Sequence, residues 1–96
     1  MSNPRLGHDL RATAGAGDVR RVEGFLTEGV QLDEPDEHGH TALCRAAIFG
    51  HVRVMSCLLE AGADANARDS AGLSVLILAA AFPRPEAVRF WMEART

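Results

Sequence analysis

The chain repeats its own pattern every 33 residues, and this period limits the fold more than any other feature of the sequence. Asp69-Ser70-Ala71-Gly72 follows Asp36-Glu37-His38-Gly39 at this distance, and the two segments align without a gap. One step backwards, the first third of the chain carries matching residues, which are Leu10, Ala14, Gly17, Leu26 and Gly29. Such a period is typical of small units that cannot bury their apolar face alone and therefore stack on one another.

The central unit, residues 36–68, predicts a tight turn followed by two short helices. Gly39 suits the turn because glycine adopts positive φ without strain. Thr41 is the expected N-cap of the first helix, and Gly50 is expected to end it. The second helix is expected over residues 51–61. Its apolar side chains recur on one helical face, at Val52, Met55, Leu58 and Leu59.

The motif of the central unit is Asp36-x-x-Gly39-x-Thr41-Ala42-Leu43, Ala46-Ala47-x-x-Gly50-His51 and Leu58-Leu59-x-x-Gly62-Ala63-Asp64-x-Asn66. It resembles an ankyrin repeat. It departs from the family pattern at Ala42, where the family prefers Pro, and at Cys44, where it prefers His. The resemblance implies an all-α solenoid of three stacked helix-turn-helix units with short β-turn fingers. We expect one domain over residues 1–96, with repeats at about 3–35, 36–68 and 69–96.

The first unit matches the motif less closely. Residues 1–7 are expected to be an irregular lead-in. Asp9 is expected to cap a helix over residues 10–16, and Asp18 to cap the next one. A terminal repeat needs only one buried face, which fits the small side chains of this unit.

The third unit has an almost wholly apolar first helix, expected over residues 75–82. Pro83-Arg84-Pro85 then precedes a second helix, expected over residues 86–94. A C-terminal capping repeat should have a polar outer face, and this one does not. We therefore expect the chain to be a fragment of a longer protein or a naturally short isoform.

The composition excludes several classes of function. The formal net charge of −3 argues against a nucleic-acid binder, which would normally carry a basic face. The longest apolar run, residues 73–82, is about half a membrane span, and no signal peptide is expected at the N-terminus. Two cysteines are too few for a disulfide framework and suit reduced thiols. We expect a cytoplasmic or nuclear protein that contacts neither membrane nor nucleic acid.

Four residues prompt a metal-site hypothesis, namely His38, His40, Cys44 and His51. Zinc sites normally show paired ligands such as Cys-x-x-Cys with a second pair downstream, and this sequence lacks them. Cys44, expected to be fairly exposed, and Cys57, expected in the core, have no base and acid that converge on them. The sequence therefore predicts no metal, cofactor or catalytic residue. The resemblance implies that His51 hydrogen-bonds a neighbouring loop.

Binding of another protein is the expected function, in an adaptor or regulatory role. The resemblance implies that the finger tips and the exposed side of each first helix line one concave groove. The candidate partner-binding residues are Glu37, His38, His40, Ile48, Phe49, Ser70, Leu73 and Phe82. Four of them would form an exposed apolar strip, namely Ile48, Phe49, Leu73 and Phe82. The acidic and histidine side chains would form a pH-sensitive edge. For each phenylalanine, burial between repeats is the alternative.

Two other functions stay open. The chain could be a structural segment of a longer array, or it could self-associate through its open C-terminal repeat at Phe90, Trp91 and Met92. The acidic segment 32–38 is either a solvated loop or a docking spot for a basic segment or a cation. The resemblance alone names no partner, because one fold serves many.

Overall fold

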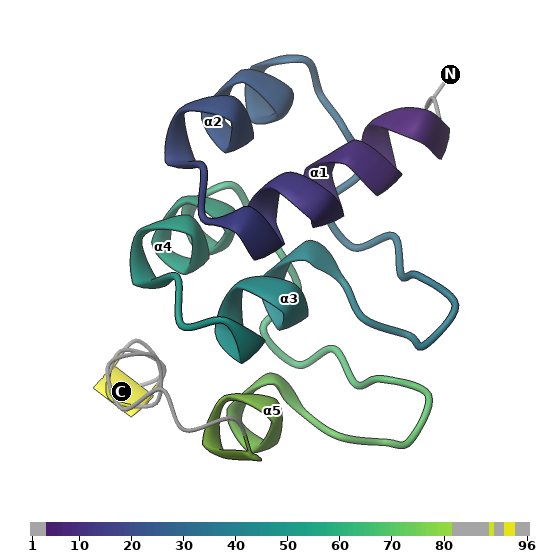
Figure 1. Ribbon diagram of the computed structural model, residues 1–96, viewed down its shortest axis with the longest axis vertical. Helices are drawn as coiled ribbons and strands as arrows, with labels where there is room; N and C mark the ends of the chain where they lie inside the picture. Colours follow the sequence, from purple (N-terminus) through teal and green to yellow (C-terminus); the bar gives the residue numbers. More distant parts are fainter. Residues whose placement is uncertain (1–3, 82–88, 90–91, 94–96) are drawn as a thin grey trace.

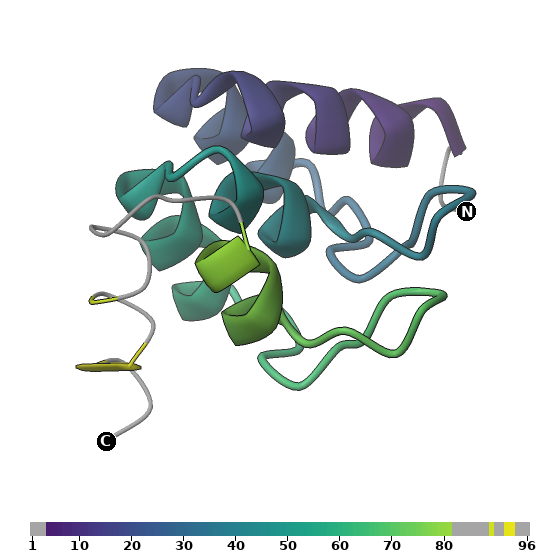
Figure 2. The ribbon, with the colours of Figure 1, turned by 60° about the horizontal axis from the view of Figure 1, so that its bottom comes forward.

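The computed structural model describes residues 4–81, 89 and 92–93. The helices in the described residues are α1 (Pro4–Ala16), α2 (Val19–Thr27), α3 (Ala42–Ile48), α4 (Val52–Glu60) and α5 (Val75–Ala81). The inner helices α1, α3 and α5 pack successively in one layer, and α2 packs on α4 in a second layer (Figures 1 and 2). The connections from α2 to α3 and from α4 to α5 project to one side as extended loops (Figure 2). The predicted all-α architecture is confirmed.

Two of the predicted helix caps, Thr41 and Asp18, are confirmed. The Thr41 hydroxyl accepts a hydrogen bond from the Cys44 amide at 3.3 Å, and Asp18 accepts one from the Arg21 amide at 3.2 Å. Gly50 follows α3 with a φ of +75°, the left-handed conformation expected there. These local signals set where α2 begins and where α3 begins and ends.

The first helix is longer than the sequence indicated. It begins at Pro4, so the prediction of an irregular lead-in is wrong for the described residues 4–7. Asp9 lies inside the helix and does not cap it. Proline is compatible with this start, because the first helical turn needs no amide hydrogen from it.

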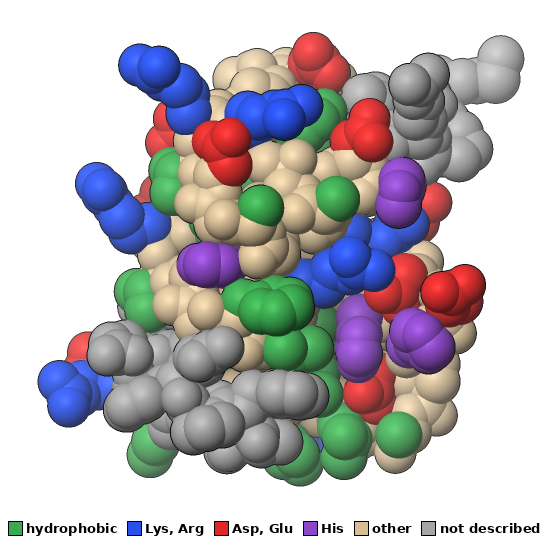
Figure 3. Space-filling view, in the orientation of Figure 1, with side chains coloured by type: hydrophobic (Ala, Val, Ile, Leu, Met, Phe, Trp, Pro, Cys, Tyr) green, Lys and Arg blue, Asp and Glu red, His purple; other side chains and the backbone are tan. Residues whose placement is uncertain are grey.

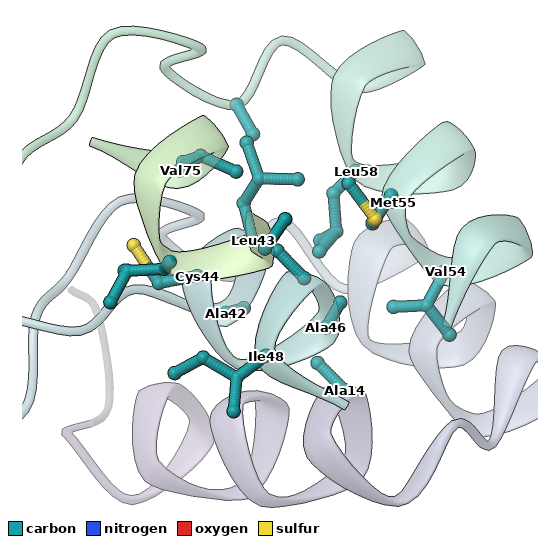
Figure 4. Close-up of a cluster of buried hydrophobic side chains, with 14 of the residues drawn as sticks. Ala14, Ala42, Leu43, Cys44, Ala46, Ile48, Val54, Met55, Leu58 and Val75 are labelled. Carbon is teal, nitrogen blue, oxygen red and sulfur yellow. The ribbon is translucent and has the colours of Figure 1, made fainter. Parts of the chain in front are cut away.

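The core lies between the two helical layers (Figure 4). Its largest fully buried side chains are Leu10, Leu43, Met55, Leu58, Val22, Val54 and Val75. Alanines buried on the inner helices, such as Ala14, Ala46 and Ala79, let these helices approach closely. Cys44 is also fully buried, so the prediction of an exposed thiol is wrong. Cys57 is only partly buried and packs against the core.

The third unit begins as predicted, with α5 at Val75. The predicted proline turn and most of the predicted second helix lie outside the described residues. Arg89, Met92 and Glu93 are helical, and all three are exposed. The proposed repeat boundaries at about 3–35, 36–68 and 69–96 stay a prediction.

Candidate protein-binding surface

Two fingers project from the helical layers, and in each of them an aspartate side chain accepts hydrogen bonds from two backbone amides. We call residues 36–41 the first finger and residues 69–74 the second finger. In the first, Asp36 Oδ1 accepts hydrogen bonds from the amides of His38 and His40, at 2.8 and 2.9 Å. In the second, Asp69 Oδ1 accepts the two equivalent bonds at 2.9 and 2.8 Å. The 33-residue period therefore extends to individual hydrogen bonds.

Arg45 of α3 fixes the first finger against the helices. Its Nη2 atom lies 2.8 Å from Asp36 Oδ2 in an ion pair whose carboxylate is almost fully buried. Partial burial alone would raise the pKa of Asp36. The Arg45 hydrogen bond and the amides of His40 and His38 outweigh burial and hold this pKa far below its ordinary value. The aspartate is therefore charged at neutral pH and occupied within its own repeat.

Two hydrogen bonds join the fingers to each other. The Ser70 amide donates to the His38 carbonyl at 3.0 Å, and His40 Nε2 lies 3.2 Å from Asp69 Oδ2. The Leu73 amide lowers the pKa of Asp69, burial opposes this, and His40 adds to the lowering. His40 thus connects successive repeats, which leaves His38 as the exposed histidine of the first finger tip.

Phe49 is an exposed aromatic residue at the C-terminal end of α3. Its side chain is 50% exposed, although it follows a buried helix. The ring lies over Gly15 of α1, where an added Cβ atom would lie 3.6 Å away from it. It also stacks on the His51 ring, with centroids 6.4 Å apart and planes 27° apart. The ring therefore has a fixed support and a free outer face.

A hydrogen bond holds the His51 ring, on which Phe49 stacks, against α1. Its Nε2 atom lies 3.0 Å from the Gly15 carbonyl oxygen. Because a carbonyl only accepts, the ring must carry a hydrogen on Nε2 and donate it. This bond joins the second unit to the first, as expected, but its acceptor lies in the last turn of α1 and not in a loop.

The structure separates the predicted partner-binding residues into groups. Glu37, His38, Phe49 and Ser70 are exposed, and His40 and Leu73 are partly buried. Ile48 is only 9% exposed and belongs to the core, so its place in the predicted apolar strip is wrong. In Figure 4 its side chain lies beside α1. Phe82, Phe90 and Trp91 lie outside the described residues, whereas Met92 is exposed.

Sequence reasoning missed Arg45 as a part of this face. Arg45 and Phe49 are four residues apart, so they occupy the same side of the chain as it leaves α3. That spacing was the available signal. In Figure 3, hydrophobic, arginine and histidine side chains lie next to one another, and acidic side chains lie near the fingers as well as at the end near α1 and α2.

Cysteine and metal chemistry find no support in the described residues. No group of three or more His, Cys, Asp or Glu side chains among them is placed to hold a metal ion. Cys57 Sγ lies 3.9 Å from Glu23 Oε1. Burial, together with Glu23 and Glu60, raises the pKa of the Cys57 thiol, which is the opposite of what activates a nucleophile. No helix within the described residues is long and apolar enough to cross a membrane.

Comparison with known proteins identifies the fold. A family model described as ankyrin repeats (3 copies) matches residues 10–95. The chain belongs to the ankyrin repeat family. Such repeats generally act as non-enzymatic modules of protein–protein interaction. The family assignment and the fold that it implied are therefore confirmed.

Individual relatives are longer proteins. The chain is 31% identical over 78 residues to the ankyrin repeat protein YahD of Escherichia coli strain K12, which covers 81% of this chain and 39% of YahD. It is 36% identical over 82 residues to mouse inactive serine/threonine-protein kinase TEX14, covering 85% of this chain and 6% of that protein. Mouse ankyrin repeat domain-containing protein 40 is 39% identical over 56 residues, covering 57% and 15%. The chain thus spans well under two thirds of these relatives.

Proposed function

We propose that this chain binds another protein through a concave surface formed by Glu37, His38, Arg45, Phe49, Ser70 and Leu73. The observation that carries the proposal is the half-exposed Phe49 ring, supported by Gly15 and His51. Exposed aromatic side chains on a rigid support are the usual hot spots of protein interfaces. An adaptor or regulatory role in the cytoplasm or nucleus is part of this proposal.

The charges around Phe49 favour one kind of partner. The loop and finger over residues 30–41 carry four acidic residues, Asp33, Glu34, Asp36 and Glu37, and no Lys or Arg. Arg45 neutralises Asp36, whereas Glu37 is exposed and lies 3.7 Å from the exposed His38. A segment with an apolar side chain over Phe49 and a basic residue beside Glu37 would complement both features.

A peptide selection with two matched variants tests this proposal. Binders are selected from a displayed random-peptide library with the unmodified chain, and their affinities are measured by fluorescence anisotropy. Phe49→Glu should weaken binding at least about tenfold, as expected for a hot spot. Ile77→Glu introduces the same residue at another exposed apolar position, at the end of the stack, and should leave binding unchanged within about twofold.

The selected sequences test the partner chemistry separately. We expect an apolar residue flanked by Lys or Arg to recur among them, and Glu37→Gln to weaken these peptides at low salt. All three variants must keep the circular dichroism spectrum of the unmodified chain. Peptides that bind Phe49→Glu as tightly as the unmodified chain would contradict the proposed surface.

A further inference from the structure

Arg45 combines an anchored side chain with hydrogen-bond donors that the fold does not use. Its Nη2 atom lies 2.8 Å from Asp36 Oδ2, while Asp36 Oδ1 is occupied by the amides of His38 and His40. The Arg45 side chain is 32% exposed, and its Nε and Nη1 atoms have no acceptor among the described residues. Neither of these two atoms is sealed from solvent. Because the guanidinium is a rigid plane, the bond to Asp36 orients the remaining donors without occupying them.

These donors lie beside the aromatic ring that carries the proposed function. An added Cβ atom on Gly15 would lie 3.6 Å from the Phe49 ring and 3.8 Å from Arg45 Cβ, so both side chains lie over the same point of α1. The positions equivalent to Arg45 in the other units hold Ala12 and Leu78, whose side chains donate no hydrogen bond. Of these three equivalent positions, only that of the second unit carries a charged donor.

The surroundings of Arg45 favour an uncharged acceptor. Its positive charge is already balanced by the Asp36 carboxylate. The connection over residues 30–41 carries three further acidic residues, Asp33, Glu34 and Glu37, and no Lys or Arg. A second carboxylate on Arg45 would meet these like charges, which is unfavourable at an interface. A carbonyl oxygen accepts the same hydrogen bond without that repulsion.

The need for a free carbonyl restricts the conformation of the partner. In a helix only the last four carbonyls lack an intrahelical bond, whereas an extended segment presents unpaired carbonyls along its length. Side chains four residues apart on a helix, such as Arg45 and Phe49, are about 5–6 Å apart at Cβ. An extended chain rises about 3.3 Å per residue, so the carbonyl on Arg45 belongs within about two residues of the one over Phe49.

We propose that Arg45, oriented by Asp36, donates a hydrogen bond to a main-chain carbonyl of an extended partner segment whose apolar side chain lies on Phe49. This inference rests on the proposed function and adds the partner's conformation and the atom that Arg45 recognises. Asp36 acts as a positioning residue and does not contact the partner. Because the acceptor belongs to the main chain, no particular side chain is required at that residue of the partner.

An amide-to-ester scan of a selected peptide tests this inference. The peptide is one that the displayed library yields with the unmodified chain. Each backbone amide within two residues of the apolar anchor is replaced in turn by an ester, whose carbonyl is the weaker acceptor. One ester should weaken binding to the unmodified chain about fivefold or more, because hydrogen bonds to charged groups are the stronger ones.

Arg45→Lys isolates the contribution of the guanidinium. The lysine ammonium keeps a positive charge for Asp36 but lacks the second donor in a fixed plane. This variant should bind the amide peptide about fivefold more weakly and should lose most of the ester effect. Arg53→Lys makes the same change at an exposed position of α4 and should leave both affinities unchanged within about twofold. An ester effect that is equal in the unmodified chain and in Arg45→Lys overturns the inference, as does a scan in which no ester weakens binding.

Phe49→Glu separates this inference from the proposed function. If Phe49→Glu weakens peptide binding while Arg45→Lys keeps the full ester effect, the concave surface stands and the role of Arg45 is wrong. If Phe49→Glu leaves binding unchanged, the proposed function fails and this inference fails with it.

The selected peptides provide two further tests. Peptides that require Asp or Glu beside the apolar anchor would show that Arg45 binds a carboxylate, and peptides that become helical on binding would exclude an extended partner. Either result overturns the inference. If Arg45→Lys does not fold, the Arg45 Nε–H resonance of the unmodified chain is followed by NMR. It should shift with the amide peptide and shift less with the ester peptide, and a resonance that does not respond overturns the inference.

Discussion

The first and second fingers have the same internal hydrogen bonds but different surroundings. In each, the aspartate amide donates to a carbonyl four residues later at 3.0 Å, and the glycine amide donates back to the aspartate carbonyl. Gly39 and Gly72 have φ values of +79° and +81°. Yet the second finger packs against the first, whereas no described residue packs against Gly72 at the outer edge of the second. The turn is therefore a local property of its sequence, whereas its burial depends on the next repeat.

The two aspartates show how neighbours modify one motif. Asp36 pairs with Arg45 of its own repeat, and Asp69 pairs with His40 of the repeat before it. The residue that replaces Arg45 in the third unit is Leu78, which is buried. The first finger is thus anchored to its own helix, while the second is anchored to the first finger.

Replacing each finger glycine by alanine should give the largest difference between the fingers. Both substitutions place a Cβ atom on a left-handed residue, which costs about 1–2 kcal/mol. Gly39→Ala also forces the new atom against the Ser70 backbone, so we expect a total loss on the order of 3–4 kcal/mol. Gly72→Ala should show only the conformational cost. Urea unfolding of both variants measures the two losses of stability, and equal losses would mean that the fingers do not pack as described.

Removing the charge of Asp36 should have the next largest effect. Asp36→Asn weakens a partly buried ion pair and the bonds to two amides, and it should cost about 1–3 kcal/mol near neutral pH. Because the folded-state pKa of Asp36 lies below its unfolded value, its stabilisation is complete above about pH 4 and is lost as the pH falls below that.

The pH dependence distinguishes the two aspartates. Unfolding curves for Asp36→Asn and Asp69→Asn are compared near pH 7 and at about pH 3. Asp36→Asn should flatten the acid loss of stability more than Asp69→Asn, because the pKa of Asp36 is the more strongly depressed. The comparison of the fingers would fail if Asp69→Asn had the larger effect at both pH values.

Much of this fold was predictable because local chemistry repeats along the chain. The Asp-x-x-Gly turns, the Thr41 cap and the Gly50 terminus each follow from a residue type at a fixed offset. What could not be predicted depends on neighbouring units. Ile48 and Cys44 are buried because α1 and α5 pack beside α3, and no pattern within the second unit contains that information.

The candidate site was predicted only in part for the same reason. The Phe49 ring lies over α1 at Gly15, which is 34 residues earlier and has no side chain to displace the ring. Arg45 was not predicted to be part of the surface because its partner Asp36 is not on the same helix. The start of α1 at Pro4 was missed because a proline near a terminus also suits an irregular segment.

The helix caps next to the fingers should differ more modestly. Thr41 and Ser74 are equivalent, and each hydroxyl accepts an amide of its helix at 3.3 Å. Thr41 is buried and its hydroxyl also lies 3.4 Å from Cys44 Sγ, whereas Ser74 is only partly buried. Thr41→Ala should therefore cost about 1–2 kcal/mol and Ser74→Ala about 0.5–1 kcal/mol. Thermal unfolding of both variants measures this order, and its reversal would show that burial of the cap does not matter.

The smallest effect on stability is expected at the finger tips. Glu37 is 87% exposed and its contact with His38 is long, at 3.7 Å, so Glu37→Gln should change the free energy of unfolding by less than about 0.5 kcal/mol. Ser70→Ala should be similarly mild, because Ser70 joins the fingers through its backbone amide, which the substitution keeps. Substitutions at these tips should therefore be able to change partner binding without changing the fold. A clear loss of stability in urea for Glu37→Gln would instead make this carboxylate part of the finger's structure and remove it from the proposed concave surface.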